Sequence, residues 1–135
     1  MTTQIDGTTG IQTSKVLGSD TPPTQGDELT RKDYVDGVAI GVGQTWQDMT
    51  ASRAVATTYT NSTGRPIYVH IDCTNSIGGN GTLLNINGVV SLRSSRAVSA
   101  DGAVSVAGII PAGNTYSITA ATGGTIALTL WAELR

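Results

Sequence analysis

The chain has 135 residues, of which only 13% are charged and 4% aromatic, and it contains no Phe. A formal net charge of -2 argues against non-specific nucleic-acid binding, which needs a basic surface. The single Cys excludes an internal disulfide and a paired-thiol metal motif, and no apolar run approaches the about 18 residues of a membrane-spanning helix. With so few bulky or charged side chains, we expect partner chains to complete the burial of apolar surface.

Residues 1–26 are rich in Thr, Gly and Ser, include Pro22-Pro23, and offer few apolar anchors. Such a composition cannot bury enough surface to fold by itself, so we predict an extended N-terminal arm or shaft segment. The opening MTTQIDGTTG lacks the basic start and apolar centre of a signal peptide. We therefore expect a protein that folds in a cytoplasm, with the arm lying along neighbouring chains of an oligomer.

Residues 27–43 are predicted to form a short helical linker. Thr30 is a possible N-cap, and Tyr34 and Val38 lie four positions apart, on one face of a helix. An isolated helix of this length is marginal in water. We expect copies of it to pack around an axis, with Tyr34 and Val38 in a trimer interface.

Residues 44–135 show the pattern of short strands, beginning with predicted strands near 46–49 and 54–59 and a turn at 61–66. Apolar and polar residues then alternate, which predicts a strand with one apolar and one polar face. The apolar face carries Ile67, Val69, Ile71 and Cys73, and the polar face carries Tyr68, His70 and Asp72.

A hairpin is predicted around Asn87-Gly88, a pair typical of the type I′ turn. This turn sets Ile86 opposite Val89 and Leu83 opposite Leu92. Both faces of the hairpin then carry apolar residues, so we expect one to face the core and the other to meet a neighbouring subunit. The predicted trimer interface on this hairpin comprises Leu84, Ile86 and Val89, and it is joined by Trp131 from the last strand.

Further strands are predicted at 104–110, 116–120 and 126–135. In the last strand the alternation places Ile126, Leu128, Leu130 and Leu134 inward and Thr129, Trp131, Glu133 and Arg135 on the opposite face. Seven or eight short strands with regular turns predict an all-β fold, a β-sandwich of jelly-roll type spanning 44–135.

The sequence contains no evident catalytic constellation. His70 is the single His, and Cys73, three strand positions away, should point to the opposite face. His70 and Asp72 share a face, which favours a hydrogen-bonded polar surface and leaves open a metal pair if three copies of His70 meet at an axis. The acids Asp48, Asp72, Asp101 and Glu133 are scattered. We predict no enzymatic activity, no cofactor and no metal site.

Binding is the better hypothesis, because exposed aromatic rings stack on sugars while polar side chains supply oriented hydrogen bonds. The candidate rings are Trp131, Tyr59, Tyr68 and Tyr116, each of which also suits a core or an interface. The candidate receptor-binding residues, drawn from turns and loops, are Asn61, Arg65, Asn75, Asn80, Arg93, Arg96 and Asp101.

Four segments resemble the C-terminal regions of bacteriophage and prophage tail fibres. They are LTRKDYVDG at 29–37, GQTWQDMTASRAVATTYTNSTGRPIYVHI at 43–71, IIPAGNTYSI at 109–118 and the final WAELR. The pattern W-Q-D-x-T-x-S-R-x-x-x-x-x-Y-x-N-x-T-G-x-P within the second segment is long and specific, and DGTTG at 6–10 is similar to repeated shaft segments.

The resemblance implies a homotrimeric fibre tip in the virion, assembled in the bacterial cytoplasm. It implies binding to a host surface receptor, such as lipopolysaccharide or another glycan, and contact with other tail proteins through the arm. The motif residues look like fold determinants. The alternative is a structural virion component, such as a baseplate, tail or decoration protein, without receptor contact. Full fibres are much longer, so the chain is expected to be an excised tip or a small complete tail or capsid-associated protein.

Overall fold

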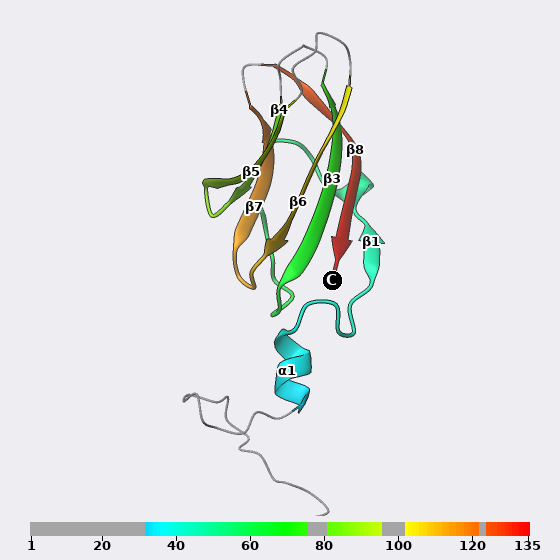
Figure 1. The fold of residues 1–135 in the computed structure, drawn as a ribbon, viewed down its shortest axis with the longest axis vertical. Coiled ribbons are helices and arrows are strands. Elements are labelled where there is room, and N and C mark those ends of the chain that lie inside the picture. Colours follow the sequence, from blue (N-terminus) through cyan, green and yellow to red (C-terminus); the bar gives the residue numbers. More distant parts are fainter. Residues whose placement is uncertain (1–31, 76–80, 96–101, 122–123) are drawn as a thin grey trace, which may run out of the picture. The chain divides into compact units, whose positions relative to one another are not determined.

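The computed structural model describes residues 32–75, 81–95, 102–121 and 124–135. The chain divides into two units, 1–35 and 36–135, and every strand of the described residues belongs to the second. The described residues contain the α-helix α1 (Lys32–Val38), the short 3-10 helix η1 (Thr50–Ser52) and eight strands (Figure 1). The predicted all-β class is therefore confirmed.

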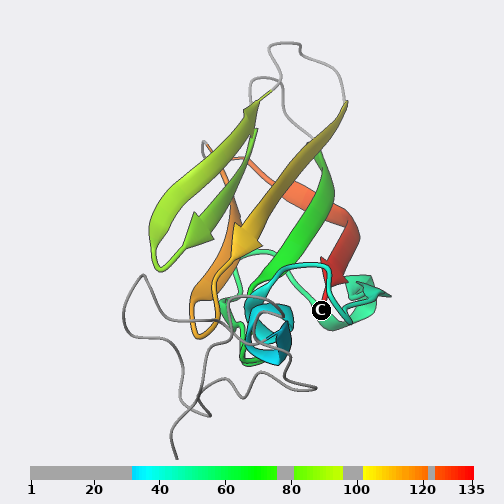
Figure 2. The same cartoon turned by 60° about the horizontal axis from the view of Figure 1, so that its bottom comes forward.

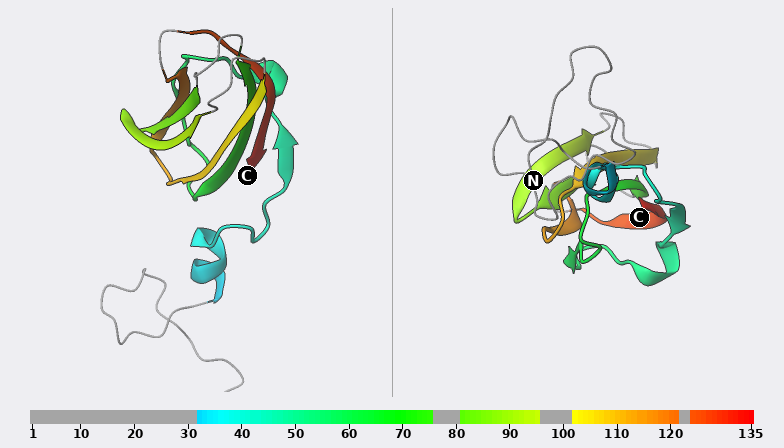
Figure 3. Two further views of the ribbon diagram at one scale, coloured as in Figure 1. Left: turned by 45° about the horizontal axis from the view of Figure 1, so that its top comes forward. Right: turned by 90° about the horizontal axis from the view of Figure 1, so that it is seen from below.

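The strands form two four-stranded antiparallel sheets. The first sheet has the order β1 (Trp46–Asp48), β8 (Ile126–Leu134), β3 (Ile67–Asn75) and β6 (Gly102–Ile110). The second has the order β2 (Tyr59–Thr60), β7 (Thr115–Ala120), β4 (Gly81–Ile86) and β5 (Val89–Ser95). Figure 3 shows the two sheets facing each other.

The core lies between the two sheets. Ile67, Val69, Ile71 and Cys73 are each at most 1% exposed, so the predicted inward face of β3 is confirmed. The buried side chains of the second sheet that share this core are Leu84, Tyr116 and Ile118. Alternation in β3 determines its burial because both of its neighbours, β6 and β8, pair with it along most of its length.

The predicted helix is shorter than expected, and none of its seven residues is buried. The side chains of Tyr34, Val35 and Val38 are 40%, 46% and 47% exposed. The predicted strand at 54–59 is also reduced, since only Tyr59–Thr60 is extended. Ala56 adopts a positive φ of 59°, which interrupts extended backbone before β2.

The predicted phase of the last strand is wrong after Leu128. The pairing between β3 and β8 shifts register, with Cys73 opposite Leu128 but Asp72 opposite Leu130. Thr129 is thus the extra residue of a β-bulge, and the inward and outward positions exchange beyond it. Trp131 and Glu133 point inward and are 0% exposed, whereas the strand pairing puts Leu130 and Leu134 on the outer face.

The β4–β5 hairpin confirms its turn and corrects its register. Asn87 and Gly88 have φ values of 50° and 77°, as a type I′ turn requires, and Ile86 pairs with Val89. A register irregularity then sets Leu84 opposite Leu92, so Leu83 does not face Leu92 as predicted. Figure 2 shows this hairpin beside β6.

Two predicted interface residues are corrected by their burial. Leu84 and Trp131 are both 0% exposed in the single chain, where they pack in the core. Neither has any surface left for a neighbouring subunit. By contrast, Val89 is 66% exposed, and Ile86 is partly buried against the core.

The sandwich has two distinct ends. At one end, here the entry end, the chain arrives at Thr45, whose backbone exchanges hydrogen bonds of 3.0 and 3.1 Å with Arg135. At the other, here the apical end, Asn75 pairs with Gly102 and with Ile126. The start of β4, the end of β5 and the end of β7 meet at that end too (Figure 1).

Candidate binding surface

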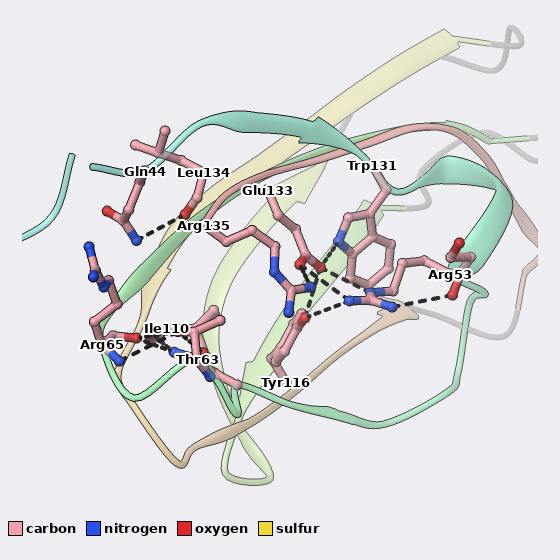
Figure 4. Close-up of polar contacts among 12 residues, drawn as sticks. Gln44, Arg53, Thr63, Arg65, Ile110, Tyr116, Trp131, Glu133, Leu134 and Arg135 are labelled. Carbon is pink, nitrogen blue, oxygen red and sulfur yellow. Dashed lines mark hydrogen bonds and ion pairs between the residues drawn. The ribbon is translucent and has the colours of Figure 1, made fainter. Parts of the chain in front are cut away.

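A buried carboxylate joins the segments that carry the tail-fibre resemblance (Figure 4). Glu133 Oε1 accepts hydrogen bonds from Arg53 Nε at 2.9 Å, the Tyr116 hydroxyl at 2.7 Å and the Trp131 indole Nε1 at 3.0 Å. Its Oε2 accepts from Arg53 Nη2 at 3.2 Å and Arg135 Nη1 at 2.9 Å. The carboxylate is surrounded by donors, so this cluster stabilises the fold and leaves little of Glu133 to offer a ligand.

The electrostatics of this cluster agree with a structural role. Burial disfavours the charged form of Glu133, but the hydrogen bonds from Arg53 and Tyr116 and the charges of Arg53 and Arg135 outweigh it and hold the pKa of the carboxyl below its usual value. Burial and the bond to Glu133 raise the pKa of Tyr116 to about 12. The network is thus composed of a permanent ion pair and a neutral phenol at ordinary pH.

Asn61, predicted to bind receptor, is instead 1% exposed. Its side chain connects the loop before β3 to the end of β6. Its amide nitrogen donates to the carbonyls of Arg65, Ile110 and Pro111 at 2.8, 3.0 and 3.1 Å. Its amide oxygen accepts from the Thr63 hydroxyl at 2.7 Å. Every one of these partners is internal, so Asn61 cannot contact a receptor, and the prediction is corrected.

Other residues of the resembling segment 43–71 also make internal contacts. Asp48 Oδ1 accepts a hydrogen bond from the Thr50 amide at 2.9 Å, and the Thr50 hydroxyl accepts one from the Trp131 amide at 2.9 Å. Gln44 donates to the Pro66 carbonyl at 2.9 Å (the bond to Leu134 is drawn in Figure 4). These contacts fit the expectation that the motif determines the fold.

The remaining predicted receptor residues are not brought into one site by the described structure. Arg65 is partly buried and donates to the Val42 carbonyl at 2.7 Å. Arg93 is exposed on β5, paired with Leu83. Asn80, Arg96, Asp101 and the side chain of Asn75 lie outside the described residues.

The predicted stacking rings divide between core and surface. Trp131 and Tyr116 are buried, and Tyr59 packs against both with ring centroids 5.8 and 6.0 Å away. Arg53 covers the Tyr59 ring at 4.4 Å from its centroid. Of the predicted rings, only Tyr68 lies on the outer face of the first sheet, because its neighbours in β3, Ile67 and Val69, point inward.

Sequence reasoning missed the most exposed aromatic side chain. Trp46, the first residue of the resemblance motif, is 56% exposed and meets the Tyr68 ring edge-to-face at 5.9 Å. Every residue of β1 is exposed, because this short strand lies at the edge of its sheet. The bulge at Thr129 cannot be recognised from the sequence, so the sequence does not distinguish the buried Trp131 from the exposed Trp46.

The outer face of the first sheet carries an apolar row across its four strands. Trp46 pairs with Leu134, Leu134 with Tyr68, and Tyr68 with Ile109, which is 53% exposed. Residues directly opposite on antiparallel strands share a face, so these four side chains form one stripe. We call this stripe the aromatic row.

A polar cluster lies further along the same face. His70 Nε2 is 3.2 Å from Asp72 Oδ1, and the Ser105 hydroxyl donates to the same oxygen at 2.5 Å. Both cross-strand neighbours of His70 are alanines, Ala107 and Ala132, whose small side chains leave the imidazole projecting beyond them. The predicted shared face of His70 and Asp72 is confirmed, while Cys73 is buried on the opposite side.

Among the described residues, no group of three or more His, Cys, Asp or Glu side chains could hold a metal ion. In the same part of the chain, no helix is long and apolar enough to cross a membrane. Comparisons with models of known protein families and with curated proteins found no match.

Proposed function

We propose that this chain forms the receptor-binding tip of a bacteriophage tail fibre and attaches the virion to a glycan on the host cell surface. The observation that supports this best is the separation of the two ends of the sandwich. The chain enters at Thr45, and three pairs of consecutive strands connect at the far end, after β3, β5 and β7. A fibre tip needs this arrangement, with its support at one end and its connecting loops at the other.

The strand order supports a jelly-roll fold for the tip. The two sheets, β1-β8-β3-β6 and β2-β7-β4-β5, place the strands in the alternating order expected when a long hairpin is rolled into two Greek keys. The first strand then pairs with the last, and the fourth pairs with the fifth, as in this chain.

We further propose a homotrimer in the virion. The support is the exposed apolar surface, since β5 has no buried residue and carries Val89, Val90 and Leu92 at 66%, 51% and 40% exposure. Tyr34, Val38, Ile86 and Val89 remain candidates for the interface. Light scattering should give three times the chain mass of 13.8 kDa, and a monomer would contradict this part of the proposal.

Host binding is tested with fluorescently labelled protein on a panel of bacterial strains. Saturable binding to some strains, lost when the surface polysaccharide is removed, is the expected result. As a competition control, prior addition of the protein should block adsorption of a phage that uses the same strain. Failure to bind any strain of a broad panel would count against the receptor-binding role.

The second candidate is a structural virion protein that contacts only other virion proteins. The same exposed apolar residues on β5 favour it, because a permanent protein contact would cover them. Binding to purified tail or capsid proteins without binding to cells would select this candidate.

We propose no catalytic activity for either candidate. Within the described residues, His70 and Cys73 lie on opposite faces of β3, and Glu133 is enclosed by its donors, so nothing supports a nucleophile-and-base pair. Host polysaccharide should keep its size after incubation with the protein, and shortened chains would show an enzyme.

A further inference from the structure

We infer that the outer face of the first sheet carries a sugar-binding site for neutral or amino sugars, distinct from the apical end. It is formed by the aromatic row and the neighbouring polar cluster of His70, Asp72 and Ser105. This inference deepens the proposed function, on which the choice of a glycan rests.

The aromatic row supplies the apolar half of the site. Trp46 exposes 56% of its surface although it contacts Tyr68 at 5.9 Å. The edge-to-face contact fixes the orientation of the two rings without covering the indole. A pyranose has one face lined with C–H groups, and a fixed, exposed indole gives that face a flat surface on which to stack.

The polar cluster supplies the oriented hydrogen bonds. Asp72 is held by two neighbours, since His70 Nε2 and the Ser105 hydroxyl both contact Oδ1. The side chains of His70 and Asp72 are still 39% and 30% exposed. A carboxylate fixed in this way can accept bonds from sugar hydroxyls through its other oxygen, and a few polar groups of this kind determine orientation in small-molecule sites.

The spacing of the two halves suits a sugar. Tyr68 and His70 are alternate residues of β3, and Asp72 is the next residue on the same face. Alternate residues of a strand are about 6.6 Å apart, so the ladder from Tyr68 to Asp72 spans about 13 Å, the length of two or three sugar rings. Ala107 and Ala132 beside His70 leave room for a ring to lie against the sheet.

Charge selects among sugars. The face carries the carboxylates of Asp72 and of Asp48, whose partner in the sheet is Ala132, next to His70. Arg53 and Arg135, the cations nearest in sequence to β1 and β8, direct their guanidinium groups to the buried Glu133. An anionic sugar would meet carboxylates here, so neutral and amino sugars are favoured.

A second protein chain fits this face less well than a sugar. A protein partner covering the row would also cover His70, Asp72 and Ser105, and would remove their polar groups from water at a cost. Sugar hydroxyls replace those water contacts directly. We therefore assign the face to a sugar, and assembly through it becomes an outcome of the test.

The test measures binding of the purified full chain to immobilised neutral, amino and anionic oligosaccharides. Trp46→Ala should weaken binding to a neutral or amino sugar by about tenfold. Asp72→Asn, which keeps the shape of the side chain, should weaken it in the same direction. The control is Ser62→Ala, at an exposed position between β2 and β3 that lies outside this face and outside the proposed interface, and it should leave binding unchanged.

Thermal melting and light scattering accompany each variant. Unchanged sugar binding by both Trp46→Ala and Asp72→Asn would overturn the site, even if the wild-type protein binds cells. Loss of oligomer mass in Trp46→Ala would also overturn it, by showing that the face lies between copies. Conversely, sugar binding that depends on Trp46 in a protein that binds no bacterium would support the site and remove the tail-fibre proposal.

Discussion

At the scale of single residues, Glu133 is the residue on which the largest effect is expected. Glu133→Gln would leave Arg53 and Arg135 without a counter-charge. The loss is costly because the Arg53 side chain is only 12% exposed. Breaking a buried ion pair by removing one partner costs about 3 kcal/mol or more. Denaturant unfolding should show this loss, with the exposed-pair variant Asp72→Asn as control, expected within about 1 kcal/mol of wild type. Equal losses in both would contradict the burial of Glu133.

The same residue predicts the acid limb of the stability profile. Because the pKa of Glu133 is lowered on folding, its contribution is present above the ordinary value of 4.5 and is lost as the pH falls through the lower folded value. Melting temperatures measured at decreasing pH should therefore fall less steeply in Glu133→Gln than in wild type. Parallel curves would show that other carboxylates control acid unfolding.

The change in stability at alkaline pH is predicted from Tyr116. Its pKa is raised from 10.0 to about 12, so its contribution is present below 10.0 and disappears as the pH rises toward about 12. Stability should decline across that range, and Tyr116→Phe should remove this part of the decline. A mutant with the same slope as wild type would argue against the hydrogen bond to Glu133.

Asn61 gives a test that separates structure from binding. Asn61→Ala should leave the carbonyls of Ile110 and Pro111 without their shared donor, at a cost of about 2 kcal/mol for buried groups. Ser62→Ala, at the exposed neighbouring position, should cost much less. Calorimetry of the two variants checks this, and a stable Asn61→Ala that binds cells poorly would restore the receptor role predicted from sequence.

At the scale of elements, the start of β4 tolerates only glycine. A Cβ at Gly81 would lie 1.9 Å from the Ser94 backbone oxygen, so the two strands would have to separate there. Gly81→Ala should destabilise the hairpin by about 1–3 kcal/mol, as overpacking does in cores. Gly37→Ala, with nothing within 4 Å, is the control. Faster hydrogen exchange confined to β4 and β5 is the expected readout.

Bulges and register irregularities are the main reason why the predicted orientation of side chains was wrong in some strands. Alternation alone correctly oriented β3, where pairing is regular up to Asp72 and Cys73. In β8 one extra residue reversed the alternation, and in β5 a register irregularity moved Leu92 opposite Leu84. A bulge inserts a residue without a strong sequence signature, so the phase beyond it is determined by the partner strand.

At the scale of the whole molecule, an introduced charge should have different effects at a position buried within the chain and at one buried between chains. Leu84→Asp should unfold the protein, because Leu84 is 0% exposed in the core. Val89→Asp, at a position 66% exposed, should leave the fold intact and lower the oligomer mass if β5 lies in the interface. Circular dichroism and light scattering distinguish the two effects, and a folded trimer of Val89→Asp would exclude Val89 from the interface.

The sequence by itself determined the all-β class, the inward face of β3 and the turn at Asn87-Gly88. These features depend on local alternation and on the backbone preferences of Asn and Gly, both of which are written in neighbouring residues. Only the tertiary structure decided that Asn61, Trp131 and Glu133 are buried and that Trp46 is exposed. Their environment depends on contacts between segments far apart in the sequence, such as those of Tyr116 with Glu133, 17 residues apart, and of Thr50 with Trp131, 81 residues apart. Such long-range pairing, together with the bulge at Thr129, has no local signal that the sequence could display.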